Sequence, residues 1–151
     1  RPENFEYAEI WQTFINNITY AAHRLNEHDM TLLIEPINSK IDMPGFFIDT
    51  LDKSLQAITE VKPSNIKVQF DIYHMQIMQG NILHSLENNL QYIQHIQFAD
   101  CPGRHEPGTG ELNFQNIFNH LDHIHYARWV SAEYTPKSST QSSLAWFHQP
   151  V

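Results

Sequence analysis

The chain has 151 residues, of which 41% are hydrophobic and 17% charged, and its formal net charge is −8 at pH 7. These values are typical of one globular domain, and the acidic balance argues against sequence-independent binding to nucleic acid. No apolar run approaches the ~20 residues of a membrane span, and the single cysteine, Cys101, excludes an intramolecular disulfide and favours a reducing, cytoplasmic location.

Helix and strand patterns alternate along the chain. Apolar residues spaced at i, i+3, i+4 and i+7 predict the helices, and short apolar runs rich in β-branched and aromatic residues predict the strands. In chain order we expect a helix over 5–28, a strand within 31–37, a helix over 48–58, a strand within 65–74, a helix over 82–93, a strand over 95–100, a helix over 114–121 with Asn113 as its cap, and a strand over 128–136.

This αβαβαβαβ order indicates a single α/β domain over residues 1–151, with a parallel sheet covered by helices. A doubly wound sheet and a (β/α)-barrel both fit the order of elements. The sequence contains neither G-x-G-x-x-G nor G-x-x-x-x-G-K-[ST], the two motifs that bind the phosphates of nucleotides. We therefore expect no nucleotide cofactor.

One acidic or amide residue lies near the C-terminal end of each expected strand. These residues are Glu35 in LLIEP, Asp71 in VQFDIYH, Gln97 in HIQFAD and Glu133 in VSAEYTP. Because parallel strands all end at the same edge of a sheet, we expect the four side chains to converge. Three carboxylates in an apolar interior would repel one another unless a cation lay between them. An all-oxygen set favours Mg²⁺ or Mn²⁺ over zinc.

Other residues with metal-binding or nucleophilic chemistry have simpler interpretations. His74 follows Asp71 by three residues and is placed to touch a ligand bound at the metal. The three histidines of HLDHIH, residues 120–125, have the spacing of a metal cluster but lie between a helix and the next strand, at the opposite edge of the sheet. We interpret them as solvated, and we expect Cys101 not to act as a catalytic thiolate.

Four segments, LLIEPIN, QFDIYHMQIMQG, HIQFADCPGRHEPGTGELN and AEYTP, together resemble the hydroxypyruvate isomerase family of the xylose-isomerase-like (β/α)₈ barrels. The resemblance runs from about Arg1 to Phe147 and favours the barrel over the doubly wound sheet. It implies that Glu35, Asp71, Gln97 and Glu133 hold the metal and that the two glutamates are the proton-transfer pair. It also implies that His74 and Arg104 contact the substrate.

The activity implied by this resemblance is the isomerisation of hydroxypyruvate to tartronate semialdehyde by proton transfer through an enediolate. Isomerases or epimerases of 2-oxo-tetronates or ketoses, a metal-dependent nuclease of related barrels, and a non-catalytic barrel fragment are the alternatives. The acidic charge and Gln97 disfavour the nuclease. A complete barrel needs about 250 residues, so we expect this chain to be the second half of one. We also expect it either to belong to a longer product or to associate with another copy.

Overall fold

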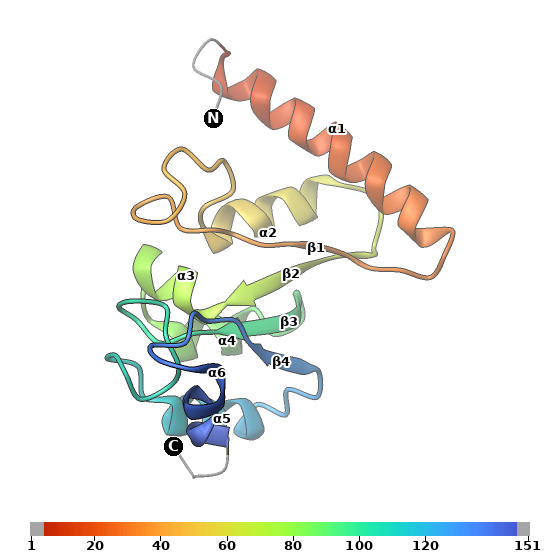
Figure 1. The fold of residues 1–151 in the computed structure, drawn as a ribbon. Helices are drawn as coiled ribbons and strands as arrows, with labels where there is room; N and C mark the ends of the chain where they lie inside the picture. Colours follow the sequence, from red (N-terminus) through yellow and green to blue (C-terminus); the bar gives the residue numbers. More distant parts are fainter. Residues whose placement is uncertain (1–4, 148–151) are drawn as a thin grey trace.

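The computed structural model describes residues 5–147, so residues 1–4 and 148–151, the two ends of the expected domain, lie outside the described part. Its centre is a parallel sheet in the order β1-β2-β3-β4 (Figure 1). The strands are β1 (Leu32–Ile34), β2 (Ile66–Asp71), β3 (Ile93–Phe98) and β4 (Trp129–Ala132). The helices are α1 (Tyr7–Asn26), α2 (Leu51–Glu60), α3 (Ile72–Met78), α4 (Ile82–Asn88), α5 (Phe114–His123), α6 (Thr140–Ser143) and the 3₁₀ turn η1 (Ala145–Phe147). Within residues 5–147, no helix is long and apolar enough to cross a bilayer.

All four expected strands and all four expected helices are present, with differences at their ends, and three short helical segments, α3, α6 and η1, were not expected. The segment 72–74, expected to end the second strand, instead begins α3, because the Asp71 carboxylate caps that helix by accepting the Tyr73 N–H at 2.8 Å. The helix expected over 82–93 ends at Asn88, and Ile93 already belongs to β3. Asn113 caps α5 as predicted, since its side chain accepts the Asn116 N–H at 2.9 Å.

The strand side chains alternate between an apolar face covered by helices and a polar face. In β2, Val68 and Phe70 are fully buried in a core shared with α2, α3, α4 and α5. A second core joins α1 to β1 and α2 through Trp11, Ile15 and Ile34. The intervening side chains of β2, which include Gln69, point to the other face. The helix-covered face therefore stabilises the sheet and leaves the polar face to carry chemistry.

One irregularity sets the register between β2 and β3. Val68 pairs with Ile93, but the next residue, Gln69, pairs with His95, so Gln94 is an extra residue in β3. Beyond this bulge the strands run in step, and Asp71 lies opposite Gln97. Strand β4 continues the alignment, with Ser131 opposite Gln97.

The sheet does not close on itself in the part of the chain that the structure describes. Strand β1 pairs only with β2, and β4 pairs only with β3, so each has one unpaired edge. The exposed side chain of Trp129 lies on β4. The residues at the C-terminal ends of all four strands are nevertheless brought to one side (Figure 1).

Candidate active site

The four strand-end residues predicted to converge lie along the C-terminal edge of the sheet. Glu35 follows β1 directly, Asp71 is the last residue of β2, Gln97 is the penultimate residue of β3, and Glu133 follows β4. The backbone N–H of Glu133 donates to the Phe98 carbonyl at 2.9 Å, which continues the β3–β4 pairing past the end of β4. Because the pairing is parallel throughout, the four side chains project from the same end of neighbouring strands.

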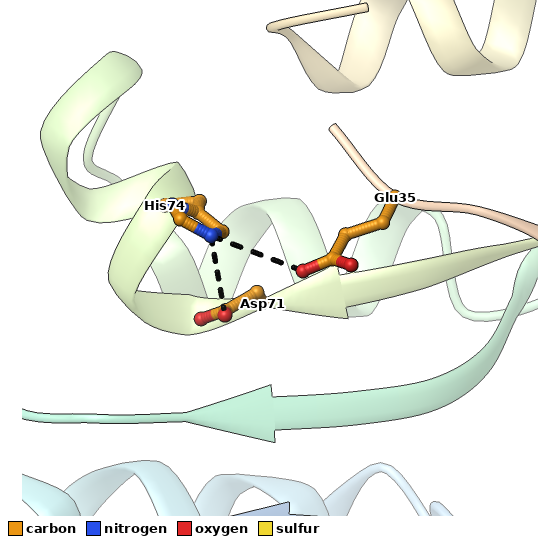
Figure 2. A group of neighbouring side chains, drawn as sticks. All are labelled: Glu35, Asp71 and His74. Atoms are coloured by element: carbon orange, nitrogen blue, oxygen red, sulfur yellow. Dashed lines mark ion pairs between the residues drawn. The ribbon is translucent and has the colours of Figure 1, made fainter. Parts of the chain in front are cut away.

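Glu35, Asp71 and His74 form the centre of this edge. One side-chain oxygen or nitrogen from each lies within 4.8 Å of the others, a spacing that a single metal ion can bridge. Figure 2 shows the His74 ring, carried by α3, facing the carboxylates of Glu35 and Asp71. Its Nε2 lies 3.9 Å from Glu35 Oε1 and 3.7 Å from Asp71 Oδ2. His74 is thus placed beside the predicted metal ligands, although the sequence did not predict it as a ligand.

Burial makes this group of carboxylates costly to ionise. The pKa of Glu35 is raised to about 7, first by burial and then by the charges of Asp71 and Glu133. The pKa of Asp71 is raised to about 6, chiefly by burial. Asp71 Oδ1 accepts the Tyr73 N–H, but Oδ2 is buried and has no hydrogen-bond partner among the described residues. A carboxylate oxygen without a hydrogen-bond partner, beside a second carboxylate, fits a hard divalent cation. Such an ion would offset both the burial of the charges and their mutual repulsion.

Gln97 joins this centre through a second glutamine that sequence reasoning did not single out as a site residue. Gln69, on β2, donates its side-chain N–H to Gln97 Oε1. Gln69 also hydrogen-bonds the Glu35 carboxylate, which lowers the pKa of that group and partly offsets its burial. Because Gln69 and Asp71 are two residues apart on one strand, the alternation of the strand alone places both on the polar face.

Arg104 joins Glu133 to the rest of the cluster. Its Nη2 lies 2.9 Å from Glu133 Oε2 and 3.8 Å from Asp71 Oδ2, and its Nη1 lies 3.9 Å from Asp42 Oδ2. The guanidinium also lies over the Tyr73 ring, 5.3 Å from its centroid. The loop after β3, in which Arg104 was expected to contact the substrate, therefore places a guanidinium among the carboxylates of Asp42, Asp71 and Glu133.

A single buried carboxylate organises that loop, and its role was not predicted. Asp100 is fully buried, and its two oxygens accept five backbone N–H groups at 2.8–3.1 Å. The donors belong to Cys101, Gly108, Thr109, Gly110 and Leu112. A Cβ atom at Gly110 would overlap the Cys101 carbonyl oxygen and lie 2.5 Å from Asp100 Oδ1, so this position requires glycine.

The loop after β1 contributes a second buried polar residue that sequence reasoning missed. Asn38 is fully buried, and its side-chain nitrogen lies 2.7 Å from His74 Nδ1 and 3.0 Å from Asp42 Oδ2. In the sequence, only its position three residues after Glu35 indicates that Asn38 lies near the site. The sequence offered no way to foresee its contact with His74, because the two lie in separate loop and helix segments 36 residues apart.

The remaining histidines and the cysteine take no part in this cluster. His120 lies on α5, on another part of the molecule, with its Nε2 3.8 Å from Glu87 Oε2. His123 and His125 are exposed as expected, but His120 is half-buried and its Nε2 is buried, so the expectation of a solvated side chain was wrong for this residue. Within residues 5–147, the one group of histidine, cysteine and acidic side chains close enough to hold a metal is Glu35, Asp71 and His74. Cys101 is buried, and burial raises the pKa of its thiol, which disfavours the thiolate.

The chain resembles known proteins over almost its whole length. A family model described as xylose isomerase-like TIM barrel matches residues 1–149. The chain is 41% identical over 145 residues to hydroxypyruvate isomerase of Escherichia coli (strain K12) and 39% identical over 145 residues to 2-oxo-tetronate isomerase of Cupriavidus necator. These alignments cover 96% of the chain but 56% and 55% of the two relatives. The chain therefore spans about half the length of the curated relatives it matches.

Two solved structures match the fold closely. An AP endonuclease, family 2, from Brucella melitensis superposes with a TM-score of 0.92 at 40% identity, covering 97% of this chain and 56% of the other. The 3-keto-D-glucoside 4-epimerase of E. coli superposes with a TM-score of 0.86 at 23% identity, with the same coverage of 97% and 56%. At that lower identity, the likeness concerns the fold alone.

Proposed function

Because the chain belongs to the xylose isomerase-like TIM barrel family, we propose that it carries the active site of a metal-dependent isomerase. The reaction interconverts hydroxypyruvate and 2-hydroxy-3-oxopropanoate (tartronate semialdehyde). The fold is that of a TIM barrel, of which the four strands form about half, as the sequence predicted. The observation that carries the proposal is the buried, unpartnered Asp71 Oδ2 beside the Glu35 carboxylate.

Four oxygen donors would hold the cation, and we assign them as Glu35, Asp71, Gln97 and Glu133. Glu35 and Asp71 already belong to the group whose atoms lie within 4.8 Å of one another, whereas Glu133 contacts Arg104 at 2.9 Å and would turn to the cation. Carboxylate and amide oxygens favour Mg²⁺ or Mn²⁺. The raised pKa values of Glu35 and Asp71 support this assignment, because two carboxylates that resist ionisation alone are stabilised by a bound dication. When bound, such an ion would polarise the substrate carbonyl and stabilise the negative charge of the enediolate.

Glu35 and Glu133 are the proton-transfer pair of the proposal. One removes the proton from the carbon that bears the substrate hydroxyl, the other returns a proton to the neighbouring carbon, and the hydroxyl proton passes to the former carbonyl oxygen. One carbon is thereby oxidised while its neighbour is reduced, so no redox cofactor is needed. The charge of Glu133 contributes to the raised pKa of Glu35, so the two carboxylates lie within electrostatic reach of each other.

Arg104 and His74 are the substrate-binding residues of the proposal. A guanidinium carries five N–H donors, so Arg104 can contact Glu133 at 2.9 Å and still offer a pair of donors to the substrate carboxylate. His74 faces the same space from α3, with its Nε2 between the Glu35 and Asp71 carboxylates (Figure 2). The substrate is thus a small hydroxy-keto acid whose carboxylate and hydroxyl groups match these donors.

A 2-oxo-tetronate is the second candidate substrate. The chain is 39% identical to the 2-oxo-tetronate isomerase of C. necator, nearly the 41% it shares with the E. coli hydroxypyruvate isomerase. The two reactions require the same proton transfer beside a carbonyl, so the same carboxylates serve both. Relative kcat/KM values for the two acids distinguish these candidates.

The test is isomerisation by the chain loaded with Mn²⁺ or Mg²⁺, followed by proton NMR in D₂O. Turnover replaces the hydrogens on the carbon beside the hydroxypyruvate carbonyl with deuterium. Glu133→Gln is expected to abolish this exchange while the circular dichroism spectrum stays unchanged. Retained exchange in Glu133→Gln, or no exchange of either acid by the folded, metal-loaded chain, would contradict the proposal.

A further inference from the structure

The orientation of the Asn38 side chain is fixed by its neighbours. Its Oδ1 accepts the backbone N–H groups of Ile41 at 3.1 Å and Asp42 at 2.9 Å. Its Nδ2 donates to the Asp42 Oδ2 at 3.0 Å, and a carboxylate oxygen can only accept. Exchanging the amide oxygen and nitrogen would set a nitrogen donor against two N–H groups and an oxygen against a carboxylate, so one orientation is possible.

This orientation determines which nitrogen of His74 carries the hydrogen. The Asn38 Nδ2 lies 2.7 Å from His74 Nδ1 and is a donor, so Nδ1 must accept. A neutral imidazole that accepts at Nδ1 carries its hydrogen on Nε2. A doubly protonated ring would bring Nδ1–H against an amide N–H, which this contact does not allow. The ring is 2% exposed, so no water-facing alternative competes.

The Nε2–H of His74 then points at the centre of the site (Figure 2). Its distances of 3.9 Å to Glu35 Oε1 and 3.7 Å to Asp71 Oδ2 are longer than a hydrogen bond. The donor is therefore directed between the two carboxylates, where a substrate oxygen would lie, without being committed to either. A nitrogen that carries a hydrogen has no lone pair for a metal, and Nδ1 is occupied by Asn38.

We propose that Asn38 is a positioning residue that holds His74 as an Nε2–H donor to a substrate oxygen and so excludes His74 from the metal ligands. The role of this donor rests on the proposed isomerase function, whereas the tautomer rests on the contacts alone. Asp42 supports the arrangement, since its Oδ2 accepts from Asn38 while its Oδ1 accepts the Tyr73 hydroxyl at 3.3 Å. The chain of contacts runs from Tyr73 through Asp42 and Asn38 to His74.

The first test observes the tautomer in the unsubstituted chain. Nitrogen-15 NMR of the labelled chain separates protonated from unprotonated ring nitrogens, and His74→Gln identifies the His74 signals by their loss. At neutral pH, Nε2 is expected to be protonated and Nδ1 unprotonated. The opposite pattern, or rapid exchange between the two, would overturn the proposal whether or not the chain is active. A chain with this tautomer but no isomerase activity would contradict the proposed function alone.

Metal affinity provides the second test, measured as Mn²⁺ binding by calorimetry without substrate. His74→Gln is expected to leave the dissociation constant within about threefold, whereas Asp71→Asn is expected to weaken binding by ~100-fold or more. A loss in His74→Gln as large as that in Asp71→Asn would show that His74 is a ligand and overturn the proposal.

The third test asks whether Asn38 acts through His74. In Asn38→Asp, an acceptor faces Nδ1 and draws the hydrogen to that nitrogen, so Nε2 can no longer donate. We expect kcat to fall by ~100-fold, with a smaller change in KM and with the ring nitrogens exchanging roles in the NMR spectrum. The matched control is Asn89→Asp, at a half-buried asparagine that bonds the Ser85 carbonyl away from the site. An unchanged tautomer and unchanged kcat in folded Asn38→Asp would overturn the positioning role.

Discussion

The substitution Asp100→Asn tests how the loop that carries Arg104 is held. The three N–H groups of Gly108, Thr109 and Gly110 donate to Oδ2, and those of Cys101 and Leu112 donate to Oδ1. An asparagine side chain has one acceptor oxygen. If that oxygen takes the place of Oδ2 and accepts the three N–H groups, the amide nitrogen takes the place of Oδ1. The N–H groups of Cys101 and Leu112 then lose their acceptor.

Each hydrogen bond to a charged acceptor contributes about 1.5–3 kcal/mol, so the two lost bonds cost about 3–6 kcal/mol. That is a large part of the 5–15 kcal/mol by which an ordinary domain is stable, as an order of magnitude. Because Asp100 is fully buried, water cannot replace the lost acceptor. The loop is therefore expected to open locally before the rest of the chain unfolds.

Amide hydrogen exchange measures this opening residue by residue. In Asp100→Asn, the amides of residues 108–112 are expected to exchange much faster, while those of β2 and β3 keep their protection. Urea unfolding gives the global cost, and the control is Asp122→Asn, at an exposed position on α5. If residues 108–112 keep their protection and the free energy of unfolding changes by less than about 0.5 kcal/mol, an ordinary surface effect, the loop does not depend on Asp100.

Three further predictions concern the carboxylate cluster. Glu35→Gln is expected to stabilise the chelator-treated chain at pH 8 by up to ~3 kcal/mol, because the pKa of Glu35 rises from 4.5 to about 7 on folding and the native state thus disfavours its charge. The gain is lost as the pH falls from about 7 to below 4.5, where the carboxyl group is protonated in both the folded and the unfolded state. Urea unfolding at pH 8 and at pH 4 measures the gain, and no gain at pH 8 would refute the prediction. Mn²⁺ at a hundred times its dissociation constant is expected to raise the free energy of unfolding by ~2.7 kcal/mol; an equal rise in Asp71→Asn would place the ion elsewhere. Arg104→Lys is expected to raise KM for hydroxypyruvate by about tenfold, because lysine cannot make a bidentate contact with a carboxylate; an unchanged KM in steady-state kinetics would remove Arg104 from substrate binding.

The convergence of the strand-end residues could be predicted because it depends on local pattern. The chain alternates strands and helices, and its parallel strands all end at the same edge of the sheet. One polar residue at the end of each strand therefore brings Glu35, Asp71, Gln97 and Glu133 to that edge. Their roles as metal ligands and proton-transfer groups remain predictions. The beginning of α3 could not be read from the sequence, since IYHMQIM continues the apolar run of β2 and only the cap formed by Asp71 ends the strand.

The residues that sequence reasoning missed act through contacts between distant segments. Asp100 bonds main-chain N–H groups up to twelve residues ahead, which depends on the path of the loop rather than on side-chain types. Asn38 meets His74 across 36 residues. Arg104 was expected to contact substrate, but its contacts with Glu133, Asp71 and Asp42 depend on how three separate loops fold against one another.

The bulge at Gln94 decides which side chains of β3 can take part in any reaction. If Gln94 paired with Gln69 instead of forming the bulge, Asp71 would lie opposite Ile96, and Gln97 would fall out of step. A shift of one residue sends every following side chain to the other face of a strand. Deleting Gln94 itself would remove the bulge and keep Gln69 opposite His95 and Asp71 opposite Gln97, whereas deleting Ile96 would move Gln97 opposite the core residue Phe70 and turn it toward the helices. A chain that keeps all four strand-end residues can therefore still lose the site through one residue missing between the bulge and Gln97.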